Sequence, residues 1–459
     1  MGLFQSVNMT QGNPVTQVVR FTMPLLVGNI AQQLYNTVDS IIVGRYVGDN
    51  ALAAVGSAGP LLNIMIVLFI GIGAGAGIVV SQYYGAKRRE DLSRAVCSSI
   101  ILTVLASLAL MVSGPLLARP MLKLLNTPDS ILNWCQSYLS ILFLGALGGG
   151  IYNILSGVLR GLGDSISALI YLLVAVGSNI VLDFLFVAYL GMGVSGVAWA
   201  TVLAQLISAV LCLVHICRLR DTLDIRLEYF RINRKDIMPL ITLGLPSGVT
   251  QAITSMSAIL IQSLMNSYGE QFIAASTIVS RIDGFVILPA LSFGTAMTTF
   301  SGQNIGARKL NRVIYGTRQA TMTAMGVSAL LMALILLFGR PLMGIFTQTE
   351  ELIDLSYSLI RILAVGYIVM TITQCLSGIM RGAGDTLTPM WISVLTSVGL
   401  YLPLTYGLVF LTRTTGQESG NYYMIYVSLL ICWIIGALIT FVFYERGSWK
   451  SKALASVSM

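Results

Sequence analysis

The sequence predicts an all-α membrane protein whose twelve transmembrane helices form two six-helix bundles, related by pseudo-two-fold symmetry along the membrane normal. Three observations lead to this prediction. Of the 459 residues, 56% are hydrophobic and only 10% are charged, whereas soluble domains carry about 25% charged residues. Apolar stretches of helix length recur along the chain, each able to cross a hydrocarbon core of about 30 Å. Finally, motifs in the first half return in the second half at a fixed spacing.

The apolar stretches lack the short alternating pattern of a membrane barrel, so each is expected to be a helix. The predicted spans lie near 18–43, 53–81, 96–118, 132–158, 166–190, 194–217, 238–265, 272–301, 315–338, 352–379, 387–411 and 423–444. We therefore expect an N-terminal lobe at 1–217, a linker at 218–237 and a C-terminal lobe at 238–459.

The basic residues predict the orientation of the chain. Most of the 27 Lys and Arg residues fall on the side that carries both termini and the linker. The positive-inside rule places that side in the cytoplasm, so we expect a multi-pass protein of a bacterial-type cytoplasmic (inner) membrane with both termini cytoplasmic. The net charge of +8 is spread over many loops, and it therefore does not indicate nucleic-acid binding.

The two halves repeat each other at an offset of 221 residues. Six spans in each half give both halves the same orientation, an architecture typical of secondary transporters that work by alternating access. Pro24 and Pro246 lie one residue off this register, near the starts of the first and seventh spans. The matched segments are Gln-x-x-Gly-Ala followed by two basic residues at 82–88 and 303–309, Arg-Pro at 119–120 and 340–341, and Gly-x-x-Arg-Gly-x-Gly-Asp at 157–164 and 378–385.

These paired motifs and the six-plus-six plan resemble the multidrug and toxic compound extrusion (MATE) family over essentially the whole chain. The resemblance implies export of small amphipathic organic cations in exchange for H⁺ or Na⁺, by a monomer surrounded by membrane lipid. It implies no enzyme activity, no cofactor and no structural metal. The Arg-Gly-x-Gly-Asp turns are interpreted as structural reversals or a gate between the lobes.

A run of alternating glycines at 71–77 invites comparison with a phosphate-binding loop. It lies inside an apolar helix and does not follow a strand. We therefore predict close helix packing at this run.

Three carboxylates fall well inside predicted spans: Asp39, Asp183 and Asp283. A carboxylate at membrane depth is costly and marks a functional site by default. Asn179 and Asp183 are four residues apart, so they share a helix face. Asp39 closes a polar stripe at helical spacing, formed by Gln32, Tyr35, Asn36 and Asp39.

The repeat helps to interpret these acids. The positions equivalent to these residues in the second half are apolar. At the offset of 221, Asn179 and Asp183 correspond to Leu400 and Leu404, and at the offset of 222 that Pro24 and Pro246 share, Asp39 corresponds to Ile261. Acids needed only for packing should survive more often in both copies. The pattern suggests one ion-handling site in the N-terminal lobe, although a purely structural role in joining helices stays open.

In the family resemblance, Asp39, Asn179 and Asp183 match the cation-coupling positions of the N-terminal lobe, with a possible Na⁺ at these three residues. Asn153 and Thr201 match polar positions that line the same cavity. The NorM-like branch carries further acids in the C-terminal lobe, where this chain has Thr254 and Thr371. The chain therefore looks closer to the DinF-like branch.

Further candidates lie in the C-terminal lobe. Arg281 and Asp283 are two residues apart and are expected to form ion pairs with neighbouring helices or to contribute to the cavity. A cavity wall is predicted from Tyr367, Thr371 and Gln374, which recur at helical spacing. Gln374 occupies the repeat position of Asn153, so a shared packing role is equally plausible.

We hypothesise a secondary antiporter in which ion binding bends the first helix at Pro24, a hinge because proline removes a backbone donor. A nucleotide-binding domain is absent from the sequence. One alternative is a flippase for lipid or polysaccharide precursors, which usually has more helices and an arginine-rich cavity. Others are a membrane-embedded enzyme, for which the spans lack a metal or nucleophile cluster, and a major-facilitator transporter, whose Gly-Asp-Arg-type loop does not fit residues 82–89.

Overall fold

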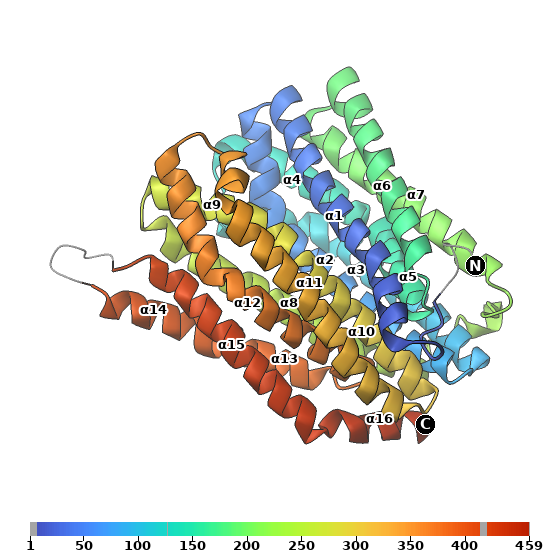
Figure 1. Cartoon of the computed structure of the whole chain (residues 1–459). Coiled ribbons are helices and arrows are strands. Elements are labelled where there is room, and N and C mark those ends of the chain that lie inside the picture. Colours follow the sequence, from blue (N-terminus) through green and yellow to red (C-terminus); the bar gives the residue numbers. More distant parts are fainter. Residues whose placement is uncertain (1–6, 126, 414–419, 459) are drawn as a thin grey trace. The chain divides into compact units, whose positions relative to one another are not determined.

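The computed structural model describes residues 7–125, 127–413 and 420–458, which form helices and no β-strand (Figure 1). The first half comprises α1 (Pro14–Tyr46), α2 (Asp49–Gly85), α3 (Arg89–Leu124), α4 (Asp129–Leu144), α5 (Ala146–Gly161), α6 (Ser165–Asp183), the π-helix η1 (Phe184–Tyr189) and α7 (Gly193–Arg218). The rest comprises the 3-10 turn η2 (Leu227–Tyr229), α8 (Arg234–Asn266), α9 (Glu270–Val286), α10 (Leu288–Gly306), α11 (Leu310–Gly344), α12 (Glu350–Gly382), α13 (Leu387–Val394), the π-helix η3 (Leu395–Tyr401), α14 (Leu402–Leu411), α15 (Tyr423–Arg446) and α16 (Ser448–Ser458).

Each predicted span coincides with helical structure, which confirms the all-α membrane fold. Within the described residues, ten helices are long and apolar enough to cross a membrane, or eleven if the bent pair α4–α5 forms one span. The remaining predicted span lies in α1, a helix of 33 residues. Its polar stripe lowers its hydropathy, which explains why composition alone does not mark it as a span.

The helices are less regular than the predicted spans. α4 and α5 meet at Gly145 with a bend of 53°, and glycine is a common cause of such kinks. α9 and α10 are separated at Ile287, just before Pro289, which lacks the N–H that a continuing helix needs. The spans predicted at 166–190 and 387–411 each contain a π-helical segment, η1 and η3.

Backbone conformation reproduces the sequence repeat. Lys87 and Arg308, 221 residues apart, have φ of 57° and 58° and are the only described non-glycine residues with positive φ, a region that side chains rarely adopt. Gly163 and Gly384 match in the same way, with φ of 89° and 88°. The two halves therefore share their turns as well as their motifs.

Glycines bring the helices of each half into close contact. A Cβ added at Gly157 of α5 would collide with the carbonyl oxygen of Gly73 in α2. The equivalent contact joins Gly378 of α12 to the carbonyl oxygen of Gly294 in α10. Gly75 lies against the backbone of Gly244 in α8. The glycine run is thus a packing surface, as predicted.

The chain forms two compact units whose boundaries differ from the predicted lobes. Unit 1 contains Met23–Gly248 and the segment that ends at Asn8, and unit 2 contains Met9–Thr22 and Val249–Met459. The first turns of α1 therefore belong to unit 2 and the first half of α8 belongs to unit 1. α1 changes unit one residue before Pro24, and α8 changes unit within three residues after Pro246. The hinge role of Pro24 stays a prediction.

Gly157→Ala is expected to destabilise the protein strongly, because the new methyl group would overlap the backbone of α2, which cannot move away as a flexible side chain could. Thermal unfolding of the purified protein measures the effect. Gly177→Ala is the matched control, because nothing lies within 4 Å of its added Cβ, and it should be neutral or stabilising by about 1 kcal/mol. Equal melting temperatures for both variants would contradict the packing role of Gly157.

Candidate functional site

The predicted polar residues of α1 and α6 meet inside unit 1. On α6, Asn179 and Asp183 are buried, with 2% and 0% of their surface exposed. Asp39 of α1 lies beside them, and its carboxyl group faces that of Asp183. A hydrogen bond between two carboxyl groups requires a proton, because an ionised carboxylate only accepts. The geometry therefore suits a shared proton.

One amide and two hydroxyl groups complete this cluster. In the amide orientation that satisfies both neighbours, Asn179 donates to Asp183 Oδ2 at 2.7 Å and accepts from the backbone N–H of Thr201 at 3.1 Å. The Tyr35 hydroxyl of α1 contacts the Thr201 side chain. The Thr201 hydroxyl also donates to the carbonyl oxygen of Val197 in its own helix, α7, at 3.0 Å. Three helices thus contribute to one polar cluster.

The cluster still has unused hydrogen-bonding capacity. Oδ1 of Asp39 and Oδ1 of Asp183 are both buried and have no hydrogen-bond partner of regular geometry. Buried polar atoms are nearly always paired, so unpaired ones call for an explanation. Two free carboxyl oxygens on adjacent helices can accept a proton or coordinate a small cation.

A backbone irregularity adjoins the site. α6 ends at Asp183, and the π-helix η1 begins at the next residue, Phe184. Single π-helical turns interrupt the ordinary hydrogen-bond ladder and occur frequently at functional sites. Sequence reasoning missed this feature, because a π segment has no strong composition signal.

The other candidates of unit 1 lie less centrally. Gln32 and Asn36 bond each other on α1, from Nε2 to Oδ1 at 3.4 Å, and Asn36 is exposed. Asn153 donates to the carbonyl oxygen of Gly149 in its own helix at 2.8 Å. Neither hydrogen bond involves an acid of the cluster. The structure therefore separates a core of five residues, Tyr35, Asp39, Asn179, Asp183 and Thr201, from these outlying positions.

In unit 2, the candidates occupy different surroundings. The Tyr367 hydroxyl faces Asp283. Thr371 is fully buried and hydrogen-bonds Ser328 Oγ at 2.7 Å, and its hydroxyl also lies 2.8 Å from the carbonyl oxygen of Tyr367. The backbone oxygen of Gln374 packs on Gly294, as that of Asn153 packs on Gly73, so these two repeat positions share a packing contact.

One expectation about unit 2 is wrong. Arg281 and Asp283 were expected to form ion pairs with neighbouring helices, but neither does so in the described part of the chain, where Arg281 is exposed. Residues two apart on a helix project in different directions, and neither direction meets an opposite charge in the described part of unit 2. Asp283 instead faces a tyrosine.

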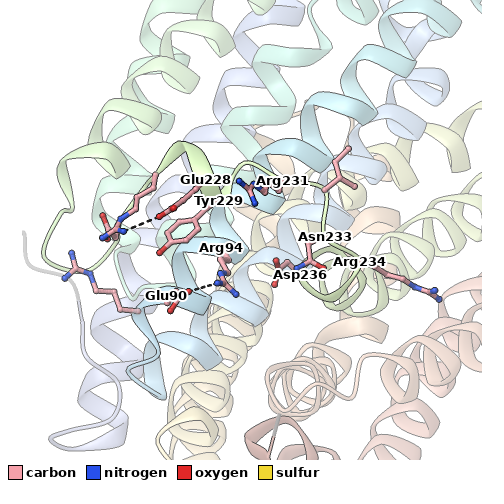
Figure 2. Close-up of a pocket in the computed structure, with 12 residues that line it drawn as sticks. Glu90, Arg94, Glu228, Tyr229, Arg231, Asn233, Arg234 and Asp236 are labelled. Carbon is pink, nitrogen blue, oxygen red and sulfur yellow. Dashed lines mark hydrogen bonds and ion pairs between the residues drawn. The ribbon is translucent and has the colours of Figure 1, made fainter.

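A polar pocket that sequence reasoning missed lies in unit 1, where the linker passes the start of α3 (Figure 2). Its volume is about 860 Å³. The dense charges of the linker were a signal for it, but they were interpreted only as a cytoplasmic connection. The lining residues are Arg89, Glu90, Arg94, Asp224, Arg226, Glu228, Tyr229, Arg231, Ile232, Asn233, Arg234 and Asp236.

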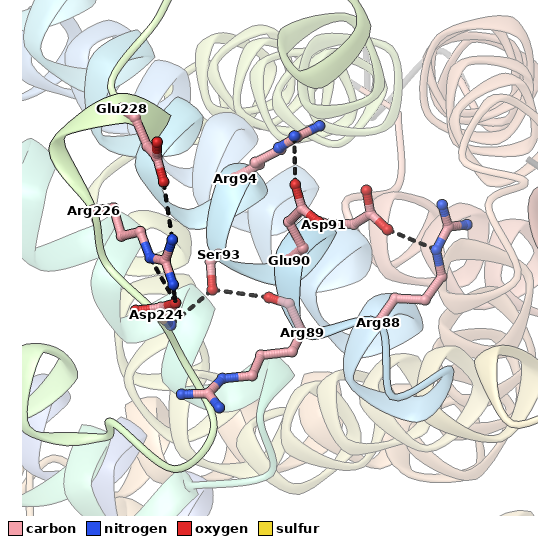
Figure 3. A network of polar contacts seen from close by, with 9 residues as sticks. All are labelled: Arg88, Arg89, Glu90, Asp91, Ser93, Arg94, Asp224, Arg226 and Glu228. Carbon is pink, nitrogen blue, oxygen red and sulfur yellow. Dashed lines mark hydrogen bonds and ion pairs between the residues drawn. The ribbon is translucent and has the colours of Figure 1, made fainter.

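Most of the charges at this pocket neutralise each other. Figure 3 shows Arg226 between Asp224, at 2.7 Å, and Glu228, at 3.2 Å. The hydrogen bonds to these two carboxylates raise the pKa of Arg226. Ser93 of α3 accepts from the backbone N–H of Asp224 and donates to the carbonyl oxygen of Arg89, both at 2.8 Å. Exposed ion pairs contribute little to stability. We therefore interpret the network as a set of contacts that hold the linker in position against α3.

Comparison with known proteins identifies the family to which this architecture belongs. The family model described as MatE matches residues 24–185 and again residues 246–407. The chain belongs to the MatE family. It is 30% identical to a protein named "Probable multidrug resistance protein YoeA" from Bacillus subtilis, over 95% of this chain and 94% of that protein. Crystal structures of MATE in the straight and in the bent conformation each match with a TM-score of 0.89 and 25% identity, over 98% of this chain and 99% of theirs.

The double match of the MatE model agrees with the internal repeat, because each match covers five of the six spans of one half. The first match begins at Pro24 and the second at Pro246, the two prolines next to the changes of unit in α1 and α8. The polar cluster of unit 1 lies within the first match, except for Thr201. The relatives align along nearly the whole length, so the resemblance is not confined to the motifs.

Replacing both Asn179 and Asp183 by leucine tests whether these polar groups serve packing. The second half carries leucine at both equivalent positions, and replacing buried ionic groups by apolar ones is often neutral or stabilising by about 1–4 kcal/mol. We expect an unchanged or higher melting temperature together with complete loss of transport. As a contrast, Asn304→Leu should lower the melting temperature, because Asn304 bonds the carbonyl oxygens of Met9 and Phe300. A large loss of stability in the double variant would favour the structural role.

Proposed function

We propose that this MatE-family protein is a multidrug efflux transporter, a secondary antiporter that exports amphipathic organic cations in exchange for H⁺ or Na⁺ by alternating access. The proposal rests mainly on the contact between the Asp39 and Asp183 carboxyl groups inside unit 1. Each of these groups has one oxygen without a hydrogen-bond partner of regular geometry. Relatives named as probable multidrug resistance proteins support a role in drug export.

The geometry favours a proton as the coupling ion. In the orientation in which Asn179 donates to Asp183, its amide oxygen faces the backbone N–H of Thr201 and not the acid pair. Binding of Na⁺ at Asp39, Asn179 and Asp183 would require the amide oxygen to turn toward the ion, because cations of this kind prefer oxygen ligands. Inward movement of either ion contributes about 2.3 kcal/mol per charge per 100 mV.

Ion binding at this cluster has a direct mechanical path to the rest of the protein. Asp39 lies on the same helix as Pro24, and α1 begins in unit 2 and continues in unit 1. Protonation would remove the repulsion between the two acids and change how the later part of α1 packs on α6. We propose that α1 then bends at Pro24 and that this bend couples ion entry to substrate release.

The environment follows from the same proposal. The protein would act in a bacterial-type cytoplasmic membrane with both termini in the cytoplasm, as the distribution of Lys and Arg predicts. We expect a functional monomer without a cofactor. Threonines at positions 254 and 371 support a DinF-like arrangement, since the Thr254 hydroxyl bonds its own helix at 2.9 Å and Thr371 bonds Ser328.

A lipid or precursor flippase is not favoured. Such a protein is expected to line its cavity with arginines, and only Arg281 and Arg361 lie well inside the predicted spans. The curated relatives carry names of drug-resistance proteins.

The test is efflux of a fluorescent cationic dye from proteoliposomes, driven separately by a pH gradient and by a Na⁺ gradient. Wild-type protein should respond to one gradient, and Asp39→Asn should lose the gradient-driven component, because a neutral amide cannot exchange the ion. Asp49→Asn, which changes an exposed acid at the start of α2, is the matched control and should behave like wild type.

Two results would contradict this proposal. One is ion-driven efflux by Asp39→Asn at the wild-type rate. The other is folded wild-type protein that moves no dye under either gradient but moves a fluorescent lipid between leaflets, which would favour the flippase.

A further inference from the structure

A further partly buried acid, Asp283, lies in unit 2. Its carboxyl group on α9 faces the Tyr367 hydroxyl on α12. Asp283 also interacts with Tyr426 on α15, whose hydroxyl contacts Ser276 on α9. Neither Asp283 Oδ1 nor Tyr367 Oη makes a hydrogen bond of regular geometry, although both atoms are buried. The arrangement thus repeats the feature that distinguishes the acid pair of unit 1.

The surroundings of Asp283 are apolar and closely packed. Tyr367 and Tyr426 are 2% and 4% exposed and belong to one hydrophobic cluster, together with Val279 and Leu363. α9 packs against α10, α11 and α12. Within the described part of unit 2, the titratable groups that interact with Asp283 are the two tyrosines, and no Lys or Arg forms an ion pair with it.

These surroundings limit what Asp283 can bind. A buried carboxylate without a cation carries a large desolvation cost, which the neutral acid avoids. The Tyr367 hydroxyl can donate to the carboxyl group whether or not that group is protonated. A proton, unlike a larger ligand, can bind there without rearrangement of the core.

The internal repeat provides a control for a packing role. At the offset of 221 residues, Asp283 corresponds to Leu62 and Tyr367 corresponds to Ala146. Ala146 is buried in the hydrophobic core of unit 1, and Leu62 packs against that core. The same place in the scaffold is therefore built without an acid or a hydroxyl.

We propose that Asp283, facing Tyr367, is a second proton-binding site of the transporter, separate from the pair Asp39 and Asp183. This inference rests on the proposed antiport function and extends it. Binding adds one proton to the carboxylate oxygen, and release returns it to water, with no other reactant. A site in each unit makes the number of protons exchanged per substrate larger than the acid pair alone provides.

The test counts protons released when the purified protein binds a cationic dye, in weakly buffered solution with a pH indicator. Asp283→Asn should release about one proton fewer per dye than wild type, because a carboxyl group holds a single ionisable proton. Asp39→Asn should lower the count independently. Glu270→Gln, which changes an exposed acid on the same helix, is the matched control and should leave the count unchanged.

Tyr367→Phe keeps the acid and removes only the hydroxyl. We expect it to keep the wild-type proton count and to shift the pH at which release is half-complete, which a merely structural role for the pair would not do. Tyr367→Phe still tests the proposal if Asp283→Asn fails to fold.

Two outcomes overturn the inference: a wild-type count in folded Asp283→Asn, or an unshifted pH dependence in Tyr367→Phe. If Asp39→Asn lowers the count while Asp283→Asn does not, the second site fails and the proposed function survives. If wild type itself releases no protons, proton coupling and the second site fail together.

Discussion

Close backbone contact at glycines is the constraint on which the rest of this structure depends. Helices in a membrane gain little from the hydrophobic effect and associate through packing, which small residues permit. Gly157 places α5 against Gly73 of α2, and Gly378 places α12 against Gly294 of α10. In each half, the Arg-Gly-x-Gly-Asp turn, at 160–164 and 381–385, follows the helix that carries this glycine and leads into the next helix. In the first half that helix is α6, which carries Asn179 and Asp183 and packs against α7.

Much of the fold could be predicted because its causes are local. Spans follow from runs of apolar residues, and the repeat follows from motifs that require special backbone angles, such as the positive φ of Gly163 and Gly384. The bend at Gly145, the π-helices and the changes of unit within α1 and α8 could not be predicted. They depend on which neighbour a helix packs against, and a single sequence contains many other glycines and prolines without such effects.

The same division applies to the candidate site. Helical spacing alone placed Asn179 and Asp183 on one face of α6, and the cost of buried charge singled out Asp39 and Asp283. Spacing within a helix cannot show which helix lies opposite, so it gave no indication that Asp283 faces Tyr367 and suggested an ion pair that the structure lacks. The linker pocket escaped detection for the same reason, since its walls come from α3 and from residues more than 130 positions later.

The positions of the acids in the two halves argue that the duplicated scaffold and the chemistry evolved under different demands. Glycines and turns recur because both units need the same packing. The acids do not recur: Asp183 has Leu404 as its counterpart, and Asp283 has Leu62. Each unit thereby shows that the other could fold with an apolar residue at that place. In the antiporter that we propose, coupling to an ion requires that the two units respond differently to it. Acids at non-equivalent positions would supply this difference, and only a few of their polar atoms lack a partner.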